Sequence, residues 1–171
     1  MFPATNNSLC LMLQGNGESN RIGRKCVVQQ VMIRGRFNLL ASGTVENGID
    51  SVRLMVIQDR QAQVGNPTVA GVLAGTDIDA FRNLQQTSRF LTLFDETYDI
   101  VSQGAMGNGT TNDIGPAIKS VDVYKRCNVP LEYSASTGAI ADLESNSVFV
   151  MCISQRGLAK FEGNARVRFI G

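Results

Sequence analysis

A long period-two alternation from Cys26 to Leu40 is the feature that most constrains the fold of this chain. Odd-numbered positions are mostly apolar there, and even-numbered positions are more polar. Successive side chains of a strand point to opposite faces, so this pattern predicts a strand with one face on a hydrophobic core. The apolar face is Val27, Gln29, Val31, Ile33, Gly35, Phe37 and Leu39, and the polar face includes Gln30, Arg34, Arg36 and Asn38.

The rest of the chain divides into further strand-like segments separated by turns rich in Gly, Asn and Pro, a pattern typical of a sandwich or barrel. These predicted strands are Ser51–Asp59, Arg89–Val101, Ile118–Val129, Leu131–Ser134, Ser147–Ser154 and Ala165–Ile170. A slip in the alternation around Asp95-Glu96 indicates a bulge or a sharp bend there. Ser147–Ser154 is apolar on both faces, as in a central or interface strand. We predict an all-β fold: a single eight-stranded antiparallel jelly roll (β-sandwich) with one or two short helical turns.

The length of 171 residues is that of one domain with a core of its own. We expect residues 1–25 to form an N-terminal segment leading into the first long strand, and residues 26–171 to form the jelly-roll domain. Within that domain, Asn47-Gly48 is a strong hairpin-type signal. Gln103–Pro116 is a polar loop long enough to be functional.

Helical signals are confined to the middle of the chain. A short helix is predicted over Thr68–Leu73, with Thr68 or Asn66 near its cap. A second helical turn is predicted to begin at Thr76, because Asp79 stands three residues further on, at the spacing of a capping box.

The sequence offers little catalytic chemistry. It contains no histidine, which removes the usual general base and the commonest metal ligand. The cysteines are far apart, which favours buried free thiols over a zinc site or a disulfide framework. We therefore expect no enzymatic activity, no catalytic residue, no cofactor and no metal ligand. The cysteines are Cys10, Cys26, Cys127 and Cys152.

Two acidic pairs and one glycine-rich stretch are the other candidate sites. Asp77/Asp79 and Asp95/Glu96 could hold a hard cation, although solvated turns are favoured for both pairs. Gly15–Ser19 is rich in glycine, but it lacks the Gly-Lys-Ser/Thr of a phosphate loop, so a nucleotide site is disfavoured. No apolar run approaches the ~20 residues that a membrane span needs.

Charge is distributed unevenly, although the net charge is only +1. Residues 1–43 carry five basic and one acidic side chain, residues 44–115 carry four and nine, and residues 116–171 carry seven and five. The two ends are therefore basic and the middle is acidic. If the fold brings the ends together, they form one positive face.

The basic residues supply the candidate functional site. If the first and last strands pair antiparallel, as in a jelly roll, the doublets Arg34-x-Arg36 and Arg166-x-Arg168 form a four-arginine patch on one sheet face. An alternative left open is that each arginine pairs with an acid from a neighbouring strand or subunit. Aromatic side chains are not interleaved with these arginines, so a contact would be to the nucleic-acid backbone and independent of base sequence. The predicted nucleic-acid-facing residues are Arg21, Arg24, Lys25, Arg34, Arg36, Arg166 and Arg168.

Several stretches resemble a known family. Leu11–Lys25, with its Gly15-Asn16-Gly17-Glu18-Ser19-Asn20-Arg21-Ile22-Gly23-Arg24-Lys25, resembles a motif just before the first long strand of capsid proteins from circular Rep-encoding single-stranded DNA (CRESS-DNA) viruses, in particular the group whose coats resemble satellite tobacco necrosis virus. The likeness continues in the same order over nearly the whole chain. Its further stretches are Val52–Gln61, Phe81–Leu84, Arg89-Phe90, Val129–Ser134 and Ala165–Phe169.

This resemblance implies a coat protein whose sixty copies close into the smallest (T=1) icosahedral shell around circular single-stranded DNA. It also implies that the first basic strand region lies toward the interior, near the genome, and that the protein occurs in the virion and, during assembly, in the host nucleus or cytoplasm. Family members usually begin with a long Arg/Lys-rich arm, whereas this sequence begins Met1-Phe2-Pro3. We therefore expect weak packaging of DNA by this armless form.

Two other classes of protein share the predicted architecture. A jelly-roll binding module, such as a trimeric ligand or a lectin-like domain, would be expected to carry a signal peptide and paired cysteines when secreted. An enzyme of the cupin type needs a histidine-rich metal cluster. The coat-protein interpretation is favoured over both, and it places subunit contacts on Ser147–Ser154 and on the loops between strands.

Overall fold

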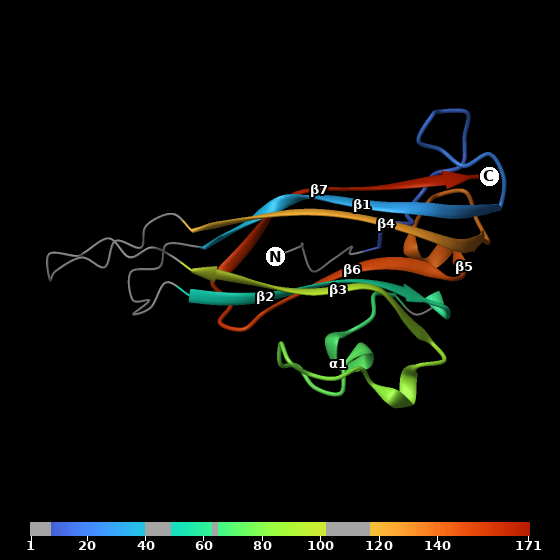
Figure 1. The fold of residues 1–171 in the computed structure, drawn as a ribbon. Helices are drawn as coiled ribbons and strands as arrows, with labels where there is room; N and C mark the ends of the chain where they lie inside the picture. The colour runs from blue at the N-terminus through green and yellow to red at the C-terminus, as the bar shows by residue number, and fades with distance from the viewer. Residues whose placement is uncertain (1–7, 40–48, 63–64, 102–116) are drawn as a thin grey trace, which may run out of the picture.

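The computed structural model describes residues 8–39, 49–62, 65–101 and 117–171, which form two antiparallel sheets packed face to face (Figure 1). One sheet has the strand order β5-β4-β1-β7 and the other has the order β3-β2-β6. The strands are β1 (Lys25–Leu39), β2 (Ile49–Asp59), β3 (Phe90–Val101), β4 (Ile118–Tyr133), β5 (Leu143–Ser145), β6 (Ser147–Ser154) and β7 (Ala159–Ile170). The helical turns are α1 (Val69–Val72), η2 (Leu84–Gln86) and η3 (Ile140–Asp142). The prediction of an all-β sandwich is confirmed.

The described residues form seven strands rather than the predicted eight. β4 runs through Pro130 and ends at Tyr133, so it joins Ile118–Val129 to most of Leu131–Ser134, which the sequence separates at Pro130. Proline is tolerated in an outer strand, and β4 is outermost at Pro130 because β5 pairs only with Glu132 and Tyr133. The predicted hairpin turn at Asn47-Gly48 and the predicted loop Gln103–Pro116 lie outside the described residues.

A bulge in β1 reverses the phase of the alternation. Val28 pairs with Phe169 and Gln30 pairs with Arg168, so Gln29 is an extra residue in β1 relative to β7. From Val31 onward the odd positions face the core as predicted. Before the bulge the prediction is wrong, because Cys26 and Val28 are buried and Val27 is only half-buried.

A second bulge lies in β3, close to the place predicted. Val56 pairs with Phe94 and Ile57 pairs with Thr92, which leaves Leu93 as the extra residue. The bulge predicted around Asp95-Glu96 therefore lies two residues before Asp95, and Asp95 and Glu96 themselves lie in a regular ladder opposite β2. Both carboxylates have local partners that the sequence does not reveal, as described below.

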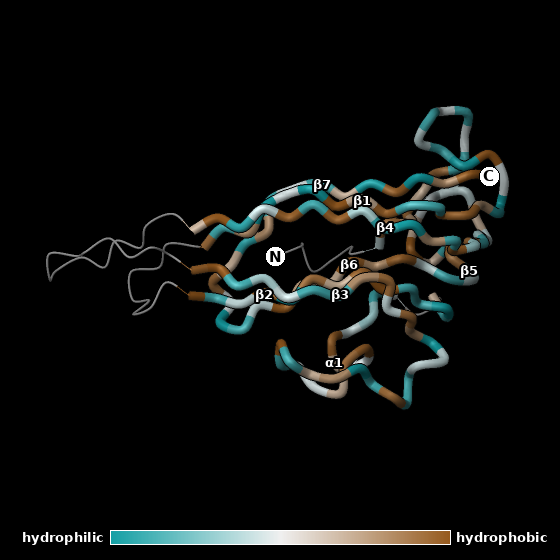
Figure 2. The backbone as a smooth tube through the Cα atoms, in the orientation of Figure 1, coloured by the Kyte–Doolittle hydropathy of each residue, from teal (hydrophilic) through white to brown (hydrophobic). Residues whose placement is uncertain are grey.

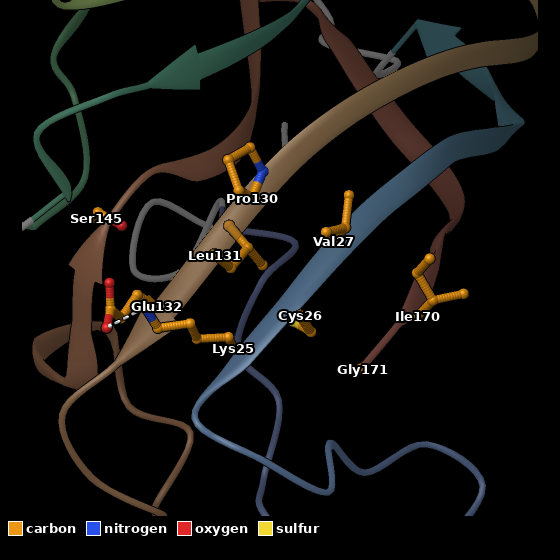
Figure 3. A pocket seen from close by; sticks show the side chains of 9 residues that line it. All are labelled: Lys25, Cys26, Val27, Pro130, Leu131, Glu132, Ser145, Ile170 and Gly171. Atoms are coloured by element: carbon orange, nitrogen blue, oxygen red, sulfur yellow. Dashed lines mark ion pairs between the residues drawn. The ribbon is translucent and has the colours of Figure 1, made fainter.

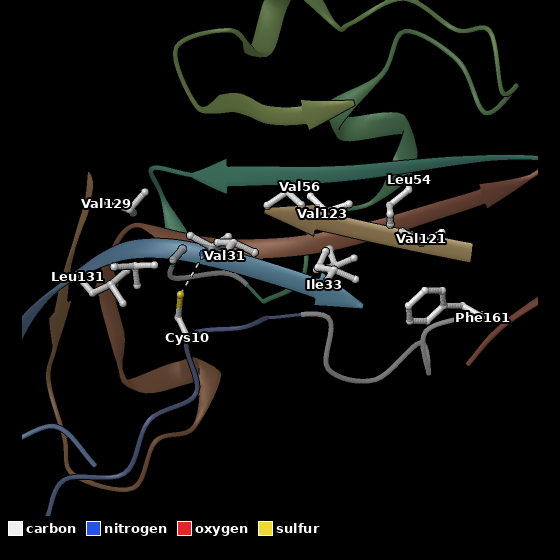
Figure 4. Close-up of a cluster of buried hydrophobic side chains, with 14 of the residues drawn as sticks. Cys10, Val31, Ile33, Leu54, Val56, Val121, Val123, Val129, Leu131 and Phe161 are labelled. Atoms are coloured by element: carbon white, nitrogen blue, oxygen red, sulfur yellow. Dashed lines mark hydrogen bonds between the residues drawn. The ribbon is translucent and has the colours of Figure 1, made fainter. Parts of the chain in front are cut away.

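The main core fills the space between the two sheets (Figure 4). Side chains alternate between this core and the outside along β1, β4 and β7, which is visible as alternating colours along the strands in Figure 2. Phe37 and Phe161 meet edge to face near one end, with ring centroids 5.2 Å apart. The labelled core side chains in Figure 4 include Val31, Ile33, Leu54, Val56, Val121, Val123, Val129 and Leu131.

A smaller core lies on the other face of the β3-β2-β6 sheet. Residues 65–89, which we call the covering segment, cross that face and contribute Val72 and Leu73 (Figure 1). β6 is apolar on both faces, although it is an edge strand of its sheet, because each of its faces packs on a different core. The free edge of β6 also receives a hydrogen bond, from Leu9 N to Val148 O at 2.8 Å. The remaining members of this core are Met55, Ile57, Met151 and Ile153.

The covering segment contains α1, whose N-cap is Thr68, one of the two predicted candidates. The Thr68 side chain accepts a hydrogen bond from Gly71 N at 3.2 Å. The predicted helical turn from Thr76 is wrong: Ala80 N bonds to Asp77 O in a simple turn, and the next helical residues are those of η2. No helix in the described part of the chain is long and apolar enough to cross a membrane.

Two arginines fix the covering segment to the sheet. Arg89 donates to both carboxylate oxygens of buried Asp59, at 2.9 and 2.8 Å. Arg53 binds both oxygens of Asp95, at 2.7 and 2.8 Å, and also donates to the carbonyls of Ile78 and Ala80. Bidentate arginine–carboxylate pairs hold geometry as well as charge, so this segment is a fixed part of the molecule.

The four cysteines are free thiols, as predicted. Cys10 and Cys26 are buried, whereas Cys127 and Cys152 are half-buried. Desolvation raises the pKa of Cys10 to about 12, so that thiol is protonated and unreactive at neutral pH.

Candidate nucleic-acid interface

The outer face of the four-stranded sheet gathers arginines from β4, β1 and β7. The ladders place residues in rows across these three strands. Gln30 lies between Arg126 and Arg168, and Met32 lies between Tyr124 and Arg166. In the next two rows Arg34 lies between Asp122 and Asn164, and Arg36 lies between Ser120 and Glu162. We call Arg34, Arg36, Arg126, Arg166 and Arg168 the arginine face.

The two predicted doublets share this face because β1 pairs with β7 antiparallel. Arg34 stands opposite Asn164, so its diagonal neighbour on β7 is Arg166. Diagonal positions on neighbouring strands lie within reach of long side chains. The predicted doublets therefore share one face but occupy successive rows, with the β7 doublet beside Gln30 and Met32 and the β1 doublet in the next two rows.

Only part of the arginine face is neutralised. Arg34 pairs with Asp122 at 3.0 Å, and Arg36 pairs with Glu162 at 3.3 Å. These pairs are exposed to solvent, so they contribute little to stability. Lys160 shares Glu162 at 3.4 Å, and the pKa of Glu162 is lowered by Lys160 and Arg36. The alternative that acids pair the arginines thus holds within the chain for Arg34 and Arg36.

Arg126, Arg166 and Arg168 form no ion pair with any carboxylate of the described residues. All three are exposed. With Lys160, the face carries six basic side chains against the carboxylates of Asp122 and Glu162, an excess of four positive charges. Such a surface attracts polyanions such as the phosphate backbone of nucleic acid.

Arg21 does not belong to this surface, and its prediction as a nucleic-acid-facing residue is wrong. Its side chain is fully buried. The guanidinium donates to the carbonyls of Met12, Gly23 and Ala135 and lies 4.0 Å from the centre of the Tyr133 ring. Arg21 therefore closes the loop that precedes β1, and its donors are used within the protein.

Arg24 and Lys25 lie away from the arginine face, at the start of β1. Arg24 donates to Tyr133 O at 2.9 Å and pairs with Glu144 at 3.4 Å. Lys25 pairs with Glu132 at 3.2 Å. Both charges have an acidic partner within the chain. Because both residues lie at the start of β1, the structure brings neither together with the doublets.

A mainly apolar depression of about 540 Å³ adjoins Lys25 (Figure 3). Val27, Pro130 and Ile170 form one row across β4, β1 and β7 there, because Val27 pairs with both of the others. Figure 3 shows the Lys25–Glu132 ion pair at its margin. The outer face of this sheet is thus basic over most of its length and apolar at one end.

Sequence reasoning missed Tyr124 and Arg126. Alternation within β4 places Asp122, Tyr124 and Arg126 on one side of the strand, a signal that was available. The pairing of β4 with β1 decides on which face of the sheet this side of β4 lies. The Tyr124 hydroxyl is close enough to Arg126 to raise the pKa of that guanidinium.

The acidic pairs give no cation site in the described residues, where no group of three or more Asp, Glu, Cys or His side chains could hold a metal ion. Asp95 is paired with Arg53, and Glu96 accepts a hydrogen bond from the Tyr98 hydroxyl at 2.7 Å. Asp95/Glu96 is therefore not the solvated turn that we favoured. Asp77 and Asp79 do lie in a bend and turn.

In comparisons with known proteins, no family model matches this chain, and no curated protein matches it significantly.

Proposed function

We propose that this chain is a structural coat protein that assembles into a small T=1 icosahedral shell of sixty copies around circular single-stranded DNA. The proposal combines the resemblance in Leu11–Lys25 and its ordered companions with the chemistry of the two outer faces. In this view the protein has no enzymatic activity, its main partner is itself, and it is found in the virion and, during assembly, in the host nucleus or cytoplasm. Contacts between the arginine face and the genome include the phosphate backbone and are independent of base sequence.

The sheet pairing supports a jelly-roll relationship in one respect. The first strand pairs with the last, and the second pairs with the last but one, as in a rolled-up hairpin. The order within each sheet departs from the jelly roll. In a jelly roll the last strand and the last but one are interior strands of their sheets, whereas here β7 and β6 are edge strands and β1 and β2 are interior. The proposed shell depends on the surfaces of the sandwich rather than on this order.

The observation that carries the proposal is an exposed apolar pair on the covering segment. Phe81 is 87% exposed and Leu84 is 82% exposed, although Arg53 and Arg89 fix the segment that bears them. Large apolar side chains held outward on a fixed surface mark a protein–protein contact. The covering segment that carries this pair packs on the β3-β2-β6 sheet, on the opposite side of the sandwich from the four-stranded sheet that bears the arginine face (Figure 1). A subunit with an apolar contact surface and a separate basic surface suits a shell that encloses nucleic acid.

Negative-stain electron microscopy of the purified protein, with the ratio of absorbance at 260 and 280 nm, tests this proposal. We expect closed particles of uniform size in the multi-megadalton range by light scattering. A stable monomer or trimer under all conditions would contradict the shell and favour the alternative, a jelly-roll binding module such as a trimeric or lectin-like ligand.

A further inference from the structure

We propose that the centre of the arginine face binds an unpaired base of single-stranded nucleic acid, stacked on Tyr124, while arginines around it hold the phosphates. This inference rests on the proposed function and adds a base-binding site to it. The sequence led us to expect backbone contacts alone, because no aromatic residue alternates with the arginine doublets.

A depression of about 410 Å³ lies at this place on the sheet. Ligand sites of proteins are usually concave and combine apolar surface with a few polar groups. Tyr124 is 54% exposed and stands opposite Met32, so a ring and a thioether form the apolar part of the floor. The full lining is Met32, Arg34, Asp122, Tyr124, Asn164, Ala165 and Arg166.

The polar groups around Tyr124 suit the two parts of a nucleotide. Asn164 offers an amide that can donate to and accept from the edge of a base. Asp122 is held by Arg34 at 3.0 Å, so its charge is compensated beside the depression. Arg166 lies in the same row as Met32 and Tyr124 and has no described carboxylate as partner, which leaves its guanidinium available to a phosphate.

The arginines beyond the depression extend the site in the direction a chain of phosphates would take. Arg126 and Arg168 flank Gln30 in the adjacent row. Strands lie about 4.8 Å apart, so the Cα atoms of these two arginines are roughly 10 Å apart across β1. Arg166 and Arg168 are two residues apart on one face of β7, a separation of roughly 7 Å. A flexible strand with several phosphates can reach all three cations.

Single-stranded nucleic acid fits this site better than a duplex. Bases in a duplex are stacked on one another, so an aromatic side chain on an open sheet reaches only bases that are unpaired. Stacking on an exposed aromatic ring within a basic surface is the usual mode of sequence-tolerant single-strand binding. Tyr124 and the arginines that pair with no described carboxylate should therefore select unpaired strands without selecting a base sequence.

The absence of tryptophan from this chain allows a direct test. The Tyr124→Trp variant carries a single tryptophan at the proposed stacking position. We expect oligothymidine to quench its fluorescence to saturation, while a deoxyribose-phosphate oligomer of equal length without bases binds with little quenching. Equal quenching by the two oligomers, or none by either, would overturn the base site.

Affinity measurements by fluorescence anisotropy separate stacking from charge. Tyr124→Ala should weaken binding of oligothymidine about tenfold and leave the base-free oligomer unaffected. Tyr124→Phe should bind as the unmodified protein does. Ile118→Ala, on the same side of β4 and 57% exposed, is the matched control and should have no effect. The double variant Arg166→Gln and Arg168→Gln should weaken both oligomers.

Failure of this inference can be distinguished from failure of the proposed function. If the unmodified protein forms shells and Tyr124→Ala binds oligothymidine as tightly as the unmodified protein, the base site is wrong and the coat function stands. If base-dependent binding is present but no particle forms, the coat function is wrong and the base site stands.

Discussion

The carboxylate of Asp50 shows how one buried charge can define a connection between sheets. Asp50 is fully buried at the start of β2. Its oxygens accept hydrogen bonds from the Ser154 hydroxyl at 2.6 Å and from three backbone N–H groups of the β6–β7 turn. The three donors belong to Arg156, Leu158 and Ala159, at 2.9 to 3.0 Å. Asp50 therefore joins β2 of one sheet to the turn that carries the chain into the other.

Replacing Asp50 should destabilise the fold substantially. Asp50→Ala removes the acceptor of four hydrogen bonds and leaves donors without partners, so we expect a loss of about 3 kcal/mol in the free energy of unfolding. Asp50→Asn should also destabilise, because its NH₂ group would face other donors. Urea denaturation monitored by circular dichroism measures both. Asp99→Ala, an exposed carboxylate on the neighbouring strand, is the control and should change stability by less than about 0.5 kcal/mol. If Asp99→Ala lost as much stability as Asp50→Ala, the role of Asp50 would be contradicted.

At the scale of elements, β1 and β7 depend on two glycines that face each other. Gly35 pairs with Gly163, next to the paired Phe37 and Phe161. The Phe161 ring lies over both glycines: a Cβ on Gly35 would stand 2.6 Å from Phe161 Cζ, and one on Gly163 would stand 2.8 Å from it. An aromatic ring that covers glycines in this way restores the contact that their missing side chains leave open. The alternation that predicts β1 thus contains a position where only glycine fits.

Gly35→Ala should therefore destabilise the sheet. Its Cβ would lie 2.5 Å from Glu162 O and 2.8 Å from Gly163 Cα, so the backbones of β1 and β7 would have to separate. Overpacking of this kind costs about 1–3 kcal/mol. Thermal and urea unfolding should show the loss, and Gly23→Ala should not, because its Cβ would meet nothing closer than 3.9 Å. If the stability of Gly35→Ala were unchanged, β1 and β7 would accommodate the added Cβ, and the prediction would be wrong.

On the scale of the whole molecule, the chain is layered with different chemistry on its two outer sides. The covering segment presents Phe81 and Leu84 on one side, and the arginine face lies on the other. Neither surface adds to the cores of the isolated subunit. Changes confined to these surfaces should consequently alter association and leave folding intact.

The double variant Phe81→Ser and Leu84→Ser tests the proposed contact. Burial of a large apolar side chain contributes about 1.5–3 kcal/mol, so removing two per subunit should abolish particles while the monomer keeps its unfolding temperature. Light scattering and thermal melting report the two properties separately. Phe81→Leu with Leu84→Met keeps the apolar character and should retain assembly. Particles formed at undiminished yield by the serine variant would place the subunit contacts elsewhere.

A second whole-molecule prediction concerns the arginine doublets. Arg34→Glu with Arg36→Glu should lower the nucleic acid that copurifies, and so should Arg166→Glu with Arg168→Glu. The second pair is the cleaner test, because Arg34 and Arg36 also bind Asp122 and Glu162. The absorbance ratio at 260 and 280 nm measures the effect, and circular dichroism checks the fold. An unchanged ratio in both variants would count against nucleic acid on this face.

The sequence by itself determined the all-β class, the position of most strands, the short helix that begins near Thr68 and the free cysteines. These properties are local, since alternation and capping act over a few neighbouring residues. Only the tertiary structure decided the phase of β1 around Gln29, the burial of Arg21 and the arrival of Tyr124 and Arg126 beside the doublets. Each of these depends on register between segments far apart in the chain, and register is set by packing of the shared core. The first strand and the shared face of the two arginine doublets were therefore predictable, whereas the other residues of that surface were not.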